Sequence, residues 1–329
     1  MPSPGVVPLR PLTLGDLFGG AFQTIRRNPR ATVGMAAVVT FAFMLVPILA
    51  TIVLGLTDLL PSMDLSLGQS SSSAAMDSNL GLTLSSLVAS AFGLLASLVV
   101  TGLVVRVVEG AVIGRRVTAG DAWARSRGRL LPLLGLTLLS GLVLLVVVGI
   151  PVGFALAVGL TVGSEPLTVA LVVLAVLGSL VVYAYVFFRY LVLAVPAMMS
   201  EDLGIRASMR RSAELTRGQF WRTLGIYVLA RLAASFVGQV IAIPFAVLGV
   251  VLLFALPSSW GLAGLMLSSH VSTILTGALL GPFTACVLAL MYVDERFRKE
   301  GMDIALLEQT LGAQGRPGVP GAPGSGPYR

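Results

Sequence analysis

The sequence has one histidine, His270, and one cysteine, Cys286, in 329 residues. Common zinc sites use clusters of His and Cys, and a Ser–His–Asp triad needs its histidine beside a serine nucleophile. A single cysteine cannot form an internal disulfide. We find no phosphate-binding loop, dinucleotide-binding glycine motif or nucleophile elbow. The sequence therefore predicts no catalytic residue, no metal and no cofactor, and we expect that the chain is not an enzyme.

Charged residues make up only 11% of the chain, against about 25% in ordinary soluble domains. Hydrophobic residues make up 56% and gather in long runs, which excludes an ordinary soluble domain. About 20 helical residues cross the roughly 30 Å of bilayer hydrocarbon, so each run is long enough to cross once. The six runs are 33–56, 82–105, 130–162, 167–190, 224–256 and 262–293. The three longest are expected to tilt, to begin in the interface, or to kink at Pro151, Pro244 and Pro282.

The chain carries 22 Lys and Arg residues against 15 Asp and Glu, a net charge of +7. All basic residues except Arg231 lie before the first run, around alternate connections, or after the sixth run. The other three connections carry none. Because basic loops stay in the cytoplasm, this pattern predicts a plasma-membrane protein with both termini cytoplasmic. It also accounts for the positive charge, so we expect contact with the lipid bilayer and anionic headgroups and no nucleic-acid partner.

A short segment with helix-start signals precedes the first, third and fifth runs. Thr13 and Asp16 are spaced as an N-cap and the third helical residue, and Thr118 and Asp121 repeat that spacing. Apolar residues after Thr13 recur at helical spacing, which indicates a helix with one apolar face. We therefore interpret the chain as an all-α integral membrane protein with six transmembrane helices. They form three repeats of an interfacial amphipathic helix plus a transmembrane hairpin.

The third amphipathic segment places its apolar residues on one side and its arginines on the other. Such a helix lies at the inner surface, where it binds anionic headgroups or a partner. The candidate contacts are Arg206, Arg210, Arg211, Arg217, Arg222 and Trp221. A membrane-protein partner or a second copy of the chain remains open as the bound species.

Arg231 is the one arginine expected well inside a span, about two turns beyond Leu224. Gln239 follows eight residues later. These two are the candidate polar residues within the membrane, because ionisable groups there often mark function. We favour an interfacial or packing role, with Arg231 reaching back along its stem, over a transport path.

Other charged residues are spaced to stabilise the inner ends of the spans. The predicted pairs are Arg106 with Glu109, Asp294 with Arg298, and Arg189 with Glu201 or Asp202. Glycines four residues apart permit close helix packing, which we expect within the bundle, at Gly149 with Gly153 and at Gly277 with Gly281.

Four parts follow from these patterns. They are a cytoplasmic N-terminal segment with an amphipathic helix (1–31), a six-helix membrane domain (32–293), a cytoplasmic helical extension (294–311) and a disordered Gly/Pro-rich tail (312–329). The Ser-rich connection 58–80 is expected to be a flexible outer loop.

Three motifs carry a family resemblance: Leu9–Asp16 followed by Arg26–Pro29, then Arg211–Arg222, and then Tyr292–Asp303. They resemble motifs of actinobacterial multi-pass membrane proteins labelled after the membrane domain of glycerophosphoryl diester phosphodiesterases. The resemblance extends over roughly Pro8 to Glu308 and implies a fold and a membrane location. In such phosphodiesterases a separate domain hydrolyses substrate with a His and acidic metal cluster. We expect that activity not to carry over, because this sequence has one histidine.

Three functions are compatible with these features. The favoured hypothesis is a non-enzymatic scaffold or regulatory component of a cell-envelope or lipid-related system. The alternative is a transporter or channel for a small or amphiphilic solute, since related repeats occur in transporters. An intramembrane enzyme is the least supported, because acid, base and nucleophile groups are scarce.

Overall fold

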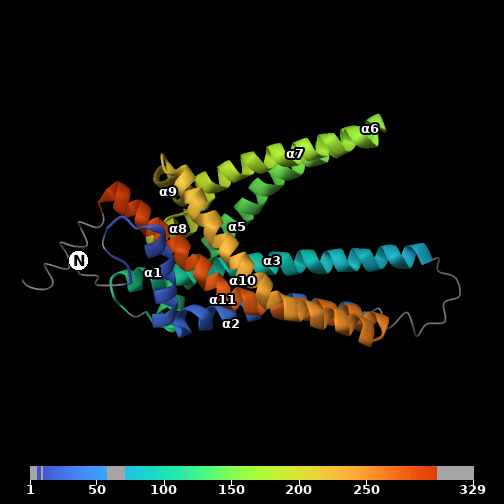
Figure 1. Ribbon diagram of the computed structural model, residues 1–329, viewed down its shortest axis with the longest axis horizontal. Coiled ribbons are helices and arrows are strands. Elements are labelled where there is room, and N and C mark those ends of the chain that lie inside the picture. Colours follow the sequence, from blue (N-terminus) through green and yellow to red (C-terminus); the bar gives the residue numbers. More distant parts are fainter. Residues whose placement is uncertain (1–5, 9, 58–70, 116, 302–329) are drawn as a thin grey trace, which may run out of the picture.

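The computed structural model describes residues 6–8, 10–57, 71–115 and 117–301. Every regular element within these ranges is a helix (Figure 1). Six helical segments among the described residues are long and apolar enough to cross a membrane, which confirms the prediction of six spans. They are Arg30–Val53, Val88–Val112, Ala119–Val162, Glu165–Ser200, Phe220–Ala255 and Trp260–Glu300.

The elements fall into three consecutive units, each with a short helix before two long helical segments. The first unit contains α1 (Leu14–Arg27), the π-turn η1 (Arg30–Gly34), α2 (Met35–Thr57) and α3 (Ser71–Val112). The second contains α4 (Ala119–Ser126), η3 (Arg127–Arg129), α5 (Leu130–Leu144), η4 (Leu145–Gly149), α6 (Ile150–Val162), α7 (Glu165–Val186), η5 (Phe187–Leu191) and α8 (Ala194–Ser200). The third contains α9 (Ile205–Thr216), α10 (Phe220–Ala255) and α11 (Ser258–Glu300). This order agrees with the expected sequence of elements, and the internal repeat itself stays a prediction.

The predicted caps begin two of the short helices. At the start of α1, the Thr13 side chain accepts a hydrogen bond from the Asp16 backbone, and Asp16 accepts one from the Thr13 backbone. Thr118 caps α4 by accepting from the backbone of Asp121. Each cap satisfies backbone N–H groups that have no partner within the helix.

The predicted outer connection 58–80 is wrong over its second part, because α3 begins at Ser71. The ten residues from Ser71 to Leu80 contain neither glycine nor proline, so nothing in them stops a helix from extending beyond the membrane. Residues 58–70, and the expected tail 312–329, lie outside the described residues. Helix α11 continues without a break past the expected membrane boundary at Val293 and ends at Glu300.

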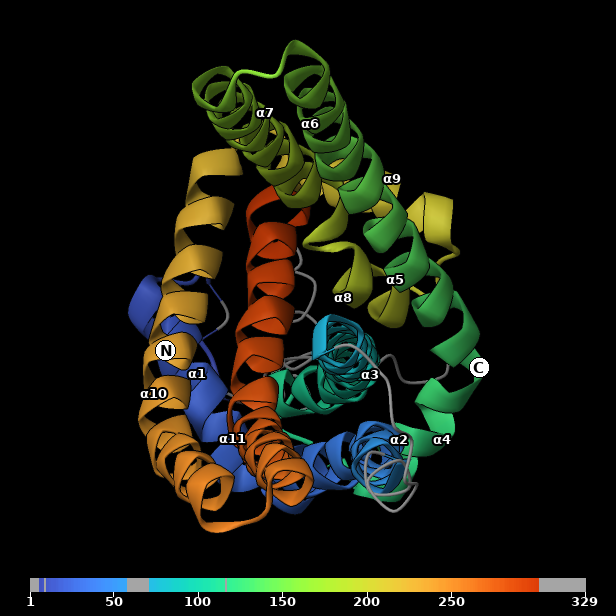
Figure 2. The same cartoon turned by 90° about the vertical axis from the view of Figure 1, so that its right-hand side faces the viewer.

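The core is formed by α2, α3 and α11, with α10 alongside α11 and α1 crossing α11 near one end (Figure 2). Gly277 on α11 approaches Thr40 so closely that a Cβ would stand 3.0 Å from the threonine methyl group, and Gly281 lies beside Val100. These two glycines therefore pack within the bundle, as predicted. In the same core His270 is buried, and its ring nitrogen Nε2 lies 3.0 Å from the Thr51 hydroxyl.

The hairpin of α6 and α7 extends away from this core (Figures 1 and 2). Its two helices pack on each other, and Gly159 leaves no room for a Cβ beside Thr168. Large apolar side chains on both helices are exposed, including Leu160, Leu174 and Val181. Such a surface is costly in water and costs nothing against lipid chains, so it fits a bilayer-embedded hairpin.

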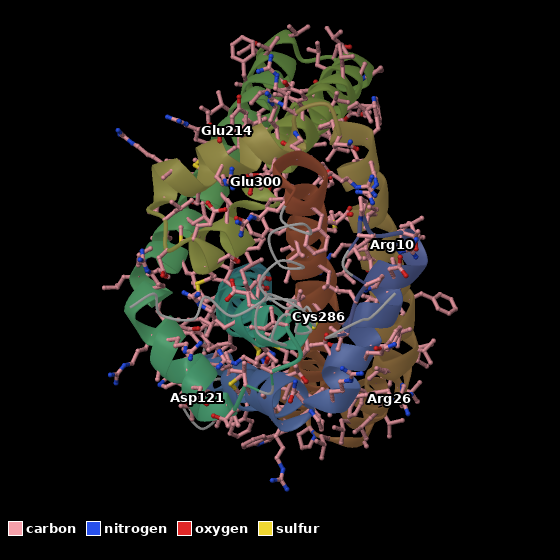
Figure 3. All side chains as sticks on the ribbon, turned by 90° about the vertical axis from the view of Figure 1, so that its left-hand side faces the viewer. Arg10, Arg26, Asp121, Glu214, Cys286 and Glu300 are labelled. Atoms are coloured by element: carbon pink, nitrogen blue, oxygen red, sulfur yellow. The ribbon has the colours of Figure 1, made fainter. Side chains whose placement is uncertain are left out.

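The charged side chains lie together at one end of the molecule, which we call the basic end. It comprises α1, α4, α9 and the last turns of α11, with Arg10, Arg26, Asp121, Glu214 and Glu300 among its side chains (Figure 3). The short helices here pack on protein as well as facing outward. On α1, for example, Leu17 and Ala21 are buried, while the Phe18 and Phe22 rings contact Phe283.

We predict that the basic end faces the cytoplasm, and single cysteines test this. Ser164→Cys, in the turn between α6 and α7, should react with a membrane-impermeant maleimide on intact cells, while Ala124→Cys, exposed on α4, should react only after permeabilisation. Native Cys286 is fully buried and supplies the unlabelled background. Labelling of Ala124→Cys on intact cells would invert the orientation.

Candidate functional site

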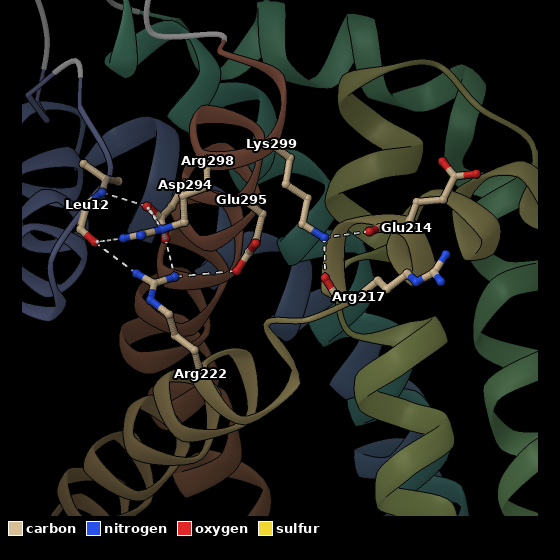
Figure 4. A network of polar contacts seen from close by, with 8 residues as sticks. All are labelled: Leu12, Glu214, Arg217, Arg222, Asp294, Glu295, Arg298 and Lys299. Carbon is tan, nitrogen blue, oxygen red and sulfur yellow. Dashed lines mark hydrogen bonds and ion pairs between the residues drawn. The ribbon is translucent and has the colours of Figure 1, made fainter.

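A buried carboxylate on α11 holds the N-terminal segment in place. Asp294 is fully buried, and its Oδ1 accepts a 2.7 Å hydrogen bond from the backbone N–H of Leu12. Arg222 donates to Oδ2 at 2.5 Å, and Arg298 donates to both oxygens at 3.1 and 3.2 Å. Both guanidinium groups also donate to the Leu12 carbonyl at 3.0 Å (Figure 4).

We call Leu12, Arg222, Asp294 and Arg298 the N-terminal clasp. Its members come from the segment before α1, the first turn of α10 and the end of α11, so it ties the first unit to the third. A buried charge is tolerated only when it is paired and hydrogen-bonded, and Asp294 has three donors. The clasp confirms the predicted pair of Asp294 and Arg298 and adds Arg222 to it.

A second group of ionic contacts fixes α9 to α11. The Arg211 guanidinium donates to Glu201 at 3.0 Å from Nε and 2.8 Å from Nη2, and it also pairs with Glu300. The Tyr292 hydroxyl donates to the same Glu201 oxygen at 2.5 Å, and Arg296 pairs with Glu300 at 2.9 Å. We call these five residues the α9 clasp.

The α9 clasp shifts the pKa of its members. Burial alone would raise the pKa of Glu201, but hydrogen bonds from Arg211 and Tyr292 and the nearby positive charges outweigh it and hold the pKa below its usual value. Burial would lower the pKa of Arg211, yet its contacts with Glu201 and Glu300 raise it. Both partners therefore remain charged across the neutral range.

Lys299 completes the attachment of α9 from the same end of α11. Its ammonium donates to the carbonyl of Glu214 at 2.8 Å and to that of Arg217 at 2.6 Å (Figure 4). These carbonyls lie at the C-terminus of α9, where a cation is favoured by the helix dipole.

Asp202 is the centre of a third group. Arg106 pairs with it at 2.8 Å and Arg129 at 3.4 Å, and Arg106 also pairs with Glu109 at 3.4 Å, as predicted. The backbone of Asp202 has a positive φ of 53°, a conformation that Asp adopts more readily than most residues. Arg106, Arg129 and Asp202 thereby join α3, the start of the third span, and the turn before α9.

The predicted pairing of Arg189 with Glu201 or Asp202 is wrong. Those carboxylates are occupied by Arg211, Arg106 and Arg129. Arg189 instead contributes its backbone, because its carbonyl accepts hydrogen bonds from Ser212 and Thr216 on the buried face of α9. The spacing of these residues in the sequence could not reveal this backbone contact, because it forms only when α9 packs across η5 in the folded protein.

The six predicted surface contacts divide into two kinds. Arg206, Arg217 and Trp221 are exposed, and Arg210 is exposed and pairs, within the described part of the chain, only with Glu214, one helical turn away on α9. Arg211 and Arg222 were grouped with them by sequence, whereas the structure pairs both with carboxylates of the same chain. Their acidic partners are far away in sequence or on another helix, so helical spacing could not identify them.

Several arginines at the basic end have no carboxylate partner within the described part of the chain, and we call them the free arginines. They are Arg26, Arg27, Arg30, Arg115, Arg125, Arg127, Arg189, Arg206 and Arg217. An exposed guanidinium is a strong bidentate donor for carboxylate or phosphate. These side chains are therefore the ones available to anything outside the protein.

Arg231 and Gln239 both lie exposed on α10. Neither has a hydrogen-bond or ion-pair partner among the described residues. Eight residues separate them, which is about 12 Å along a helix, so they do not form a contact pair. The charge of Arg231 does act on Tyr227, one turn nearer the basic end.

Glu295 follows Asp294 and is also buried, at 2% exposure. Its Oε1 lies 3.5 Å from the Arg222 guanidinium, while Oε2 has no hydrogen-bond partner among the described residues. No group of three or more His, Cys, Asp and Glu side chains in the described ranges could hold a metal ion.

Comparison with protein families matches residues 166–309 to the family described as the membrane domain of glycerophosphoryl diester phosphodiesterase. The matched range begins in the first turn of α7 and includes α8 to α11, so it contains the whole α9 clasp. It covers the later part of the resemblance seen in the sequence, and the first three spans lie outside it. Neither a curated protein nor a solved structure matches the chain.

Removing the carboxylate of the N-terminal clasp should strongly destabilise the fold. Asp294→Ala leaves Arg222 and Arg298 partly buried without their counter-ion, which is expected to cost about 3–5 kcal/mol. The exposed pair of Arg210 and Glu214 provides the control, since Arg210→Ala should cost only about 0.5 kcal/mol or less. Reversible unfolding in mixed micelles measures both, and equal losses would contradict the assignment.

The α9 clasp should weaken in acid. Because the pKa of Glu201 is lower in the folded protein than its ordinary value of 4.5, its stabilisation is complete above that value and is lost as pH falls through the lowered pKa. The melting temperature of Glu201→Gln should therefore fall below that of the wild type at neutral pH and converge with it in acid. A difference that stays constant with pH would exclude ionic stabilisation by Glu201.

Proposed function

We propose that this chain is a non-enzymatic membrane component, a scaffold or regulatory subunit of a cell-envelope or lipid-related system. Its basic end receives an acidic partner protein, and its spans hold that partner at the membrane. The similarity of residues 166–309 to a membrane domain supports the location and carries no catalytic role with it.

The observation that carries the proposal is the division of the arginines into two groups. One group forms the ion pairs of the clasps, which hold α1, α9 and α11 together as a rigid surface. Among the free arginines, Arg26 and Arg27 on α1, Arg206 on α9 and Arg217 just after α9 lie on that surface without carboxylate partners in the described chain. A rigid array of unpaired guanidinium groups binds acidic surfaces with little loss of entropy, because its backbone is already ordered.

Helix α9 offers the most suitable part of this surface. Its inner face is buried through Ser208, Ser212 and Leu215, so the helix cannot roll. Its outer face exposes Arg206 and Arg210, and Arg217 follows at its end. Charge at a rim chiefly raises the rate and specificity of association, which suits a docking surface that recruits a partner.

A photo-crosslinker at Ala207, exposed on α9, tests the proposal in cells. We expect a discrete cross-linked product with one protein. The double reversal Arg206→Glu with Arg217→Glu should abolish it, because repulsion replaces attraction at the docking surface. Arg211 is unsuitable for this test, since its reversal would break the α9 clasp.

The matched control is Arg125→Glu with Arg127→Glu on α4 and η3, which changes net charge equally at another exposed position of the basic end. The product should persist in this variant. If it disappears from both variants, the effect is general membrane electrostatics. If it persists in both, α9 is not the docking surface.

A further inference from the structure

Arg231 has no ion-pair partner among the residues that the structure describes. It lies on α10 ten residues beyond Trp221, which is about 15 Å of helix, or half the thickness of the bilayer hydrocarbon. Trp221 is 80% exposed and has the preference of tryptophan for the membrane interface. The Arg231 side chain starts within the apolar layer and leans back toward the basic end, as helical side chains do, so its guanidinium lies nearer the lipid phosphates at that interface than its Cα does.

None of the fifteen acidic residues in the sequence lies inside any of the six apolar runs. A carboxylate at the depth of Arg231 is therefore missing from this chain and equally from a second copy of it. An unpaired guanidinium at this depth costs several kcal/mol by most estimates. The partner that lowers this cost must come from the bilayer or from solution.

The position of Arg231 on α10 shows which way it faces. Tyr227, one turn before it on the same side of the helix, contacts the rings of Phe187 and Phe188 at 5.8 and 5.5 Å. Those rings belong to η5, at the end of α7. Arg231 is therefore exposed on the side of α10 that is turned toward α7.

Helices α7 and α10 diverge from this contact. They meet through η5 and the aromatic cluster at the basic end, and beyond it the α6–α7 hairpin leans away from α10 (Figure 2). Both helices expose apolar side chains, such as Tyr185 on α7 and Val228 on α10. The region between them therefore combines exposed apolar side chains, the aromatic contacts of Tyr227 with Phe187 and Phe188, and one arginine without an ion-pair partner in the described chain.

We propose that this interval between α7 and α10 is a lateral binding site for an anionic phospholipid, whose phosphate pairs with Arg231 and whose acyl chains lie along the two helices. The site is open to the bilayer, so a lipid enters without leaving the membrane. A guanidinium pairs with phosphate through two parallel hydrogen bonds. This inference goes beyond the proposed docking of a protein at α9 and does not depend on it.

Brominated lipids quench tryptophan fluorescence at short range and provide the test. In a Trp123→Phe, Trp260→Phe background, Trp221 is the only tryptophan, and it borders the site through Phe220, whose ring lies 5.5 Å away. The purified protein is placed in phosphatidylcholine vesicles containing brominated phosphatidylglycerol or brominated phosphatidylcholine. We expect about a fivefold preference for the anionic lipid, the effect of roughly one basic residue near a membrane surface.

Arg231→Leu should clearly lower this preference while leaving the melting temperature close to that of the parent, since Arg231 makes no hydrogen bond or ion pair within the described chain. Arg231→Lys should retain most of it. Arg125→Leu, on exposed α4, is the matched control and should retain all of it. Retention of the preference in Arg231→Leu, or equal loss in Arg125→Leu, overturns the proposal.

Two further experiments test whether something other than a phospholipid occupies the site. Soluble glycerol phosphate added to the vesicles should not relieve the quenching, and relief would mean that the ligand is a free phosphate compound. Ser235→Cys, one turn beyond Arg231 on the same exposed side, should stay monomeric on oxidation. A disulfide-linked dimer would assign the interval to a second copy and overturn the lipid. These experiments use purified protein, so their outcome is separate from that of the cross-linking at α9.

Discussion

The buried carboxylate of Asp294 is the contact on which the arrangement of the basic end depends. It accepts from the backbone before α1 and from a guanidinium on each of α10 and α11. A charge removed from water must have partners, and these partners come from the segment before α1, from α10 and from α11. The first and third units are thereby joined, and α1 is positioned against α11, where Phe18 and Phe22 pack on Phe283.

The clasps divide the arginines into those that stabilise the fold and those that remain available to other molecules. Arginines in the clasps pair with groups of the same chain, as Arg211 does with Glu201 and Glu300. Arginines outside the clasps keep their donors for other molecules. Composition treats both groups alike, because each residue adds one positive charge. The distinction is physical, since a saturated guanidinium gains little from a further anion whereas an unsaturated one gains two charge-assisted hydrogen bonds.

Packing is equally uneven across the membrane part. Helices α2, α3 and α11 approach closely at Gly277 and Gly281, whereas the α6–α7 hairpin contacts mostly itself. A soluble protein could not leave so much apolar surface exposed, but lipid chains solvate leucine as well as a neighbouring helix does. The second hairpin can therefore stand apart without loss of stability.

Much of the fold was predictable because its signals are local. Six spans follow from hydropathy, the caps at Thr13 and Thr118 from residue spacing, and the pairs Arg106–Glu109 and Asp294–Arg298 from one turn of helix. The helical start of α3 at Ser71 was missed because a serine-rich composition is as compatible with a loop as with a helix. The pairing of Arg189 was misassigned because closeness in sequence does not decide which side of η5 faces α9.

The sequence by itself therefore determined the number of spans, the short helices before them and the concentration of positive charge beside alternate connections. The tertiary structure alone decided which arginines pair across separate elements, how Asp294 reaches Leu12, and which hairpin leaves the bundle. The physical reason is the distance along the sequence over which each signal acts. Hydropathy and capping sum over neighbouring residues, whereas a hydrogen bond between residues 282 positions apart, from the Leu12 backbone to Asp294, exists only once the helices have packed. Lipid-facing and protein-facing apolar residues are also chemically alike, so only packing distinguishes them.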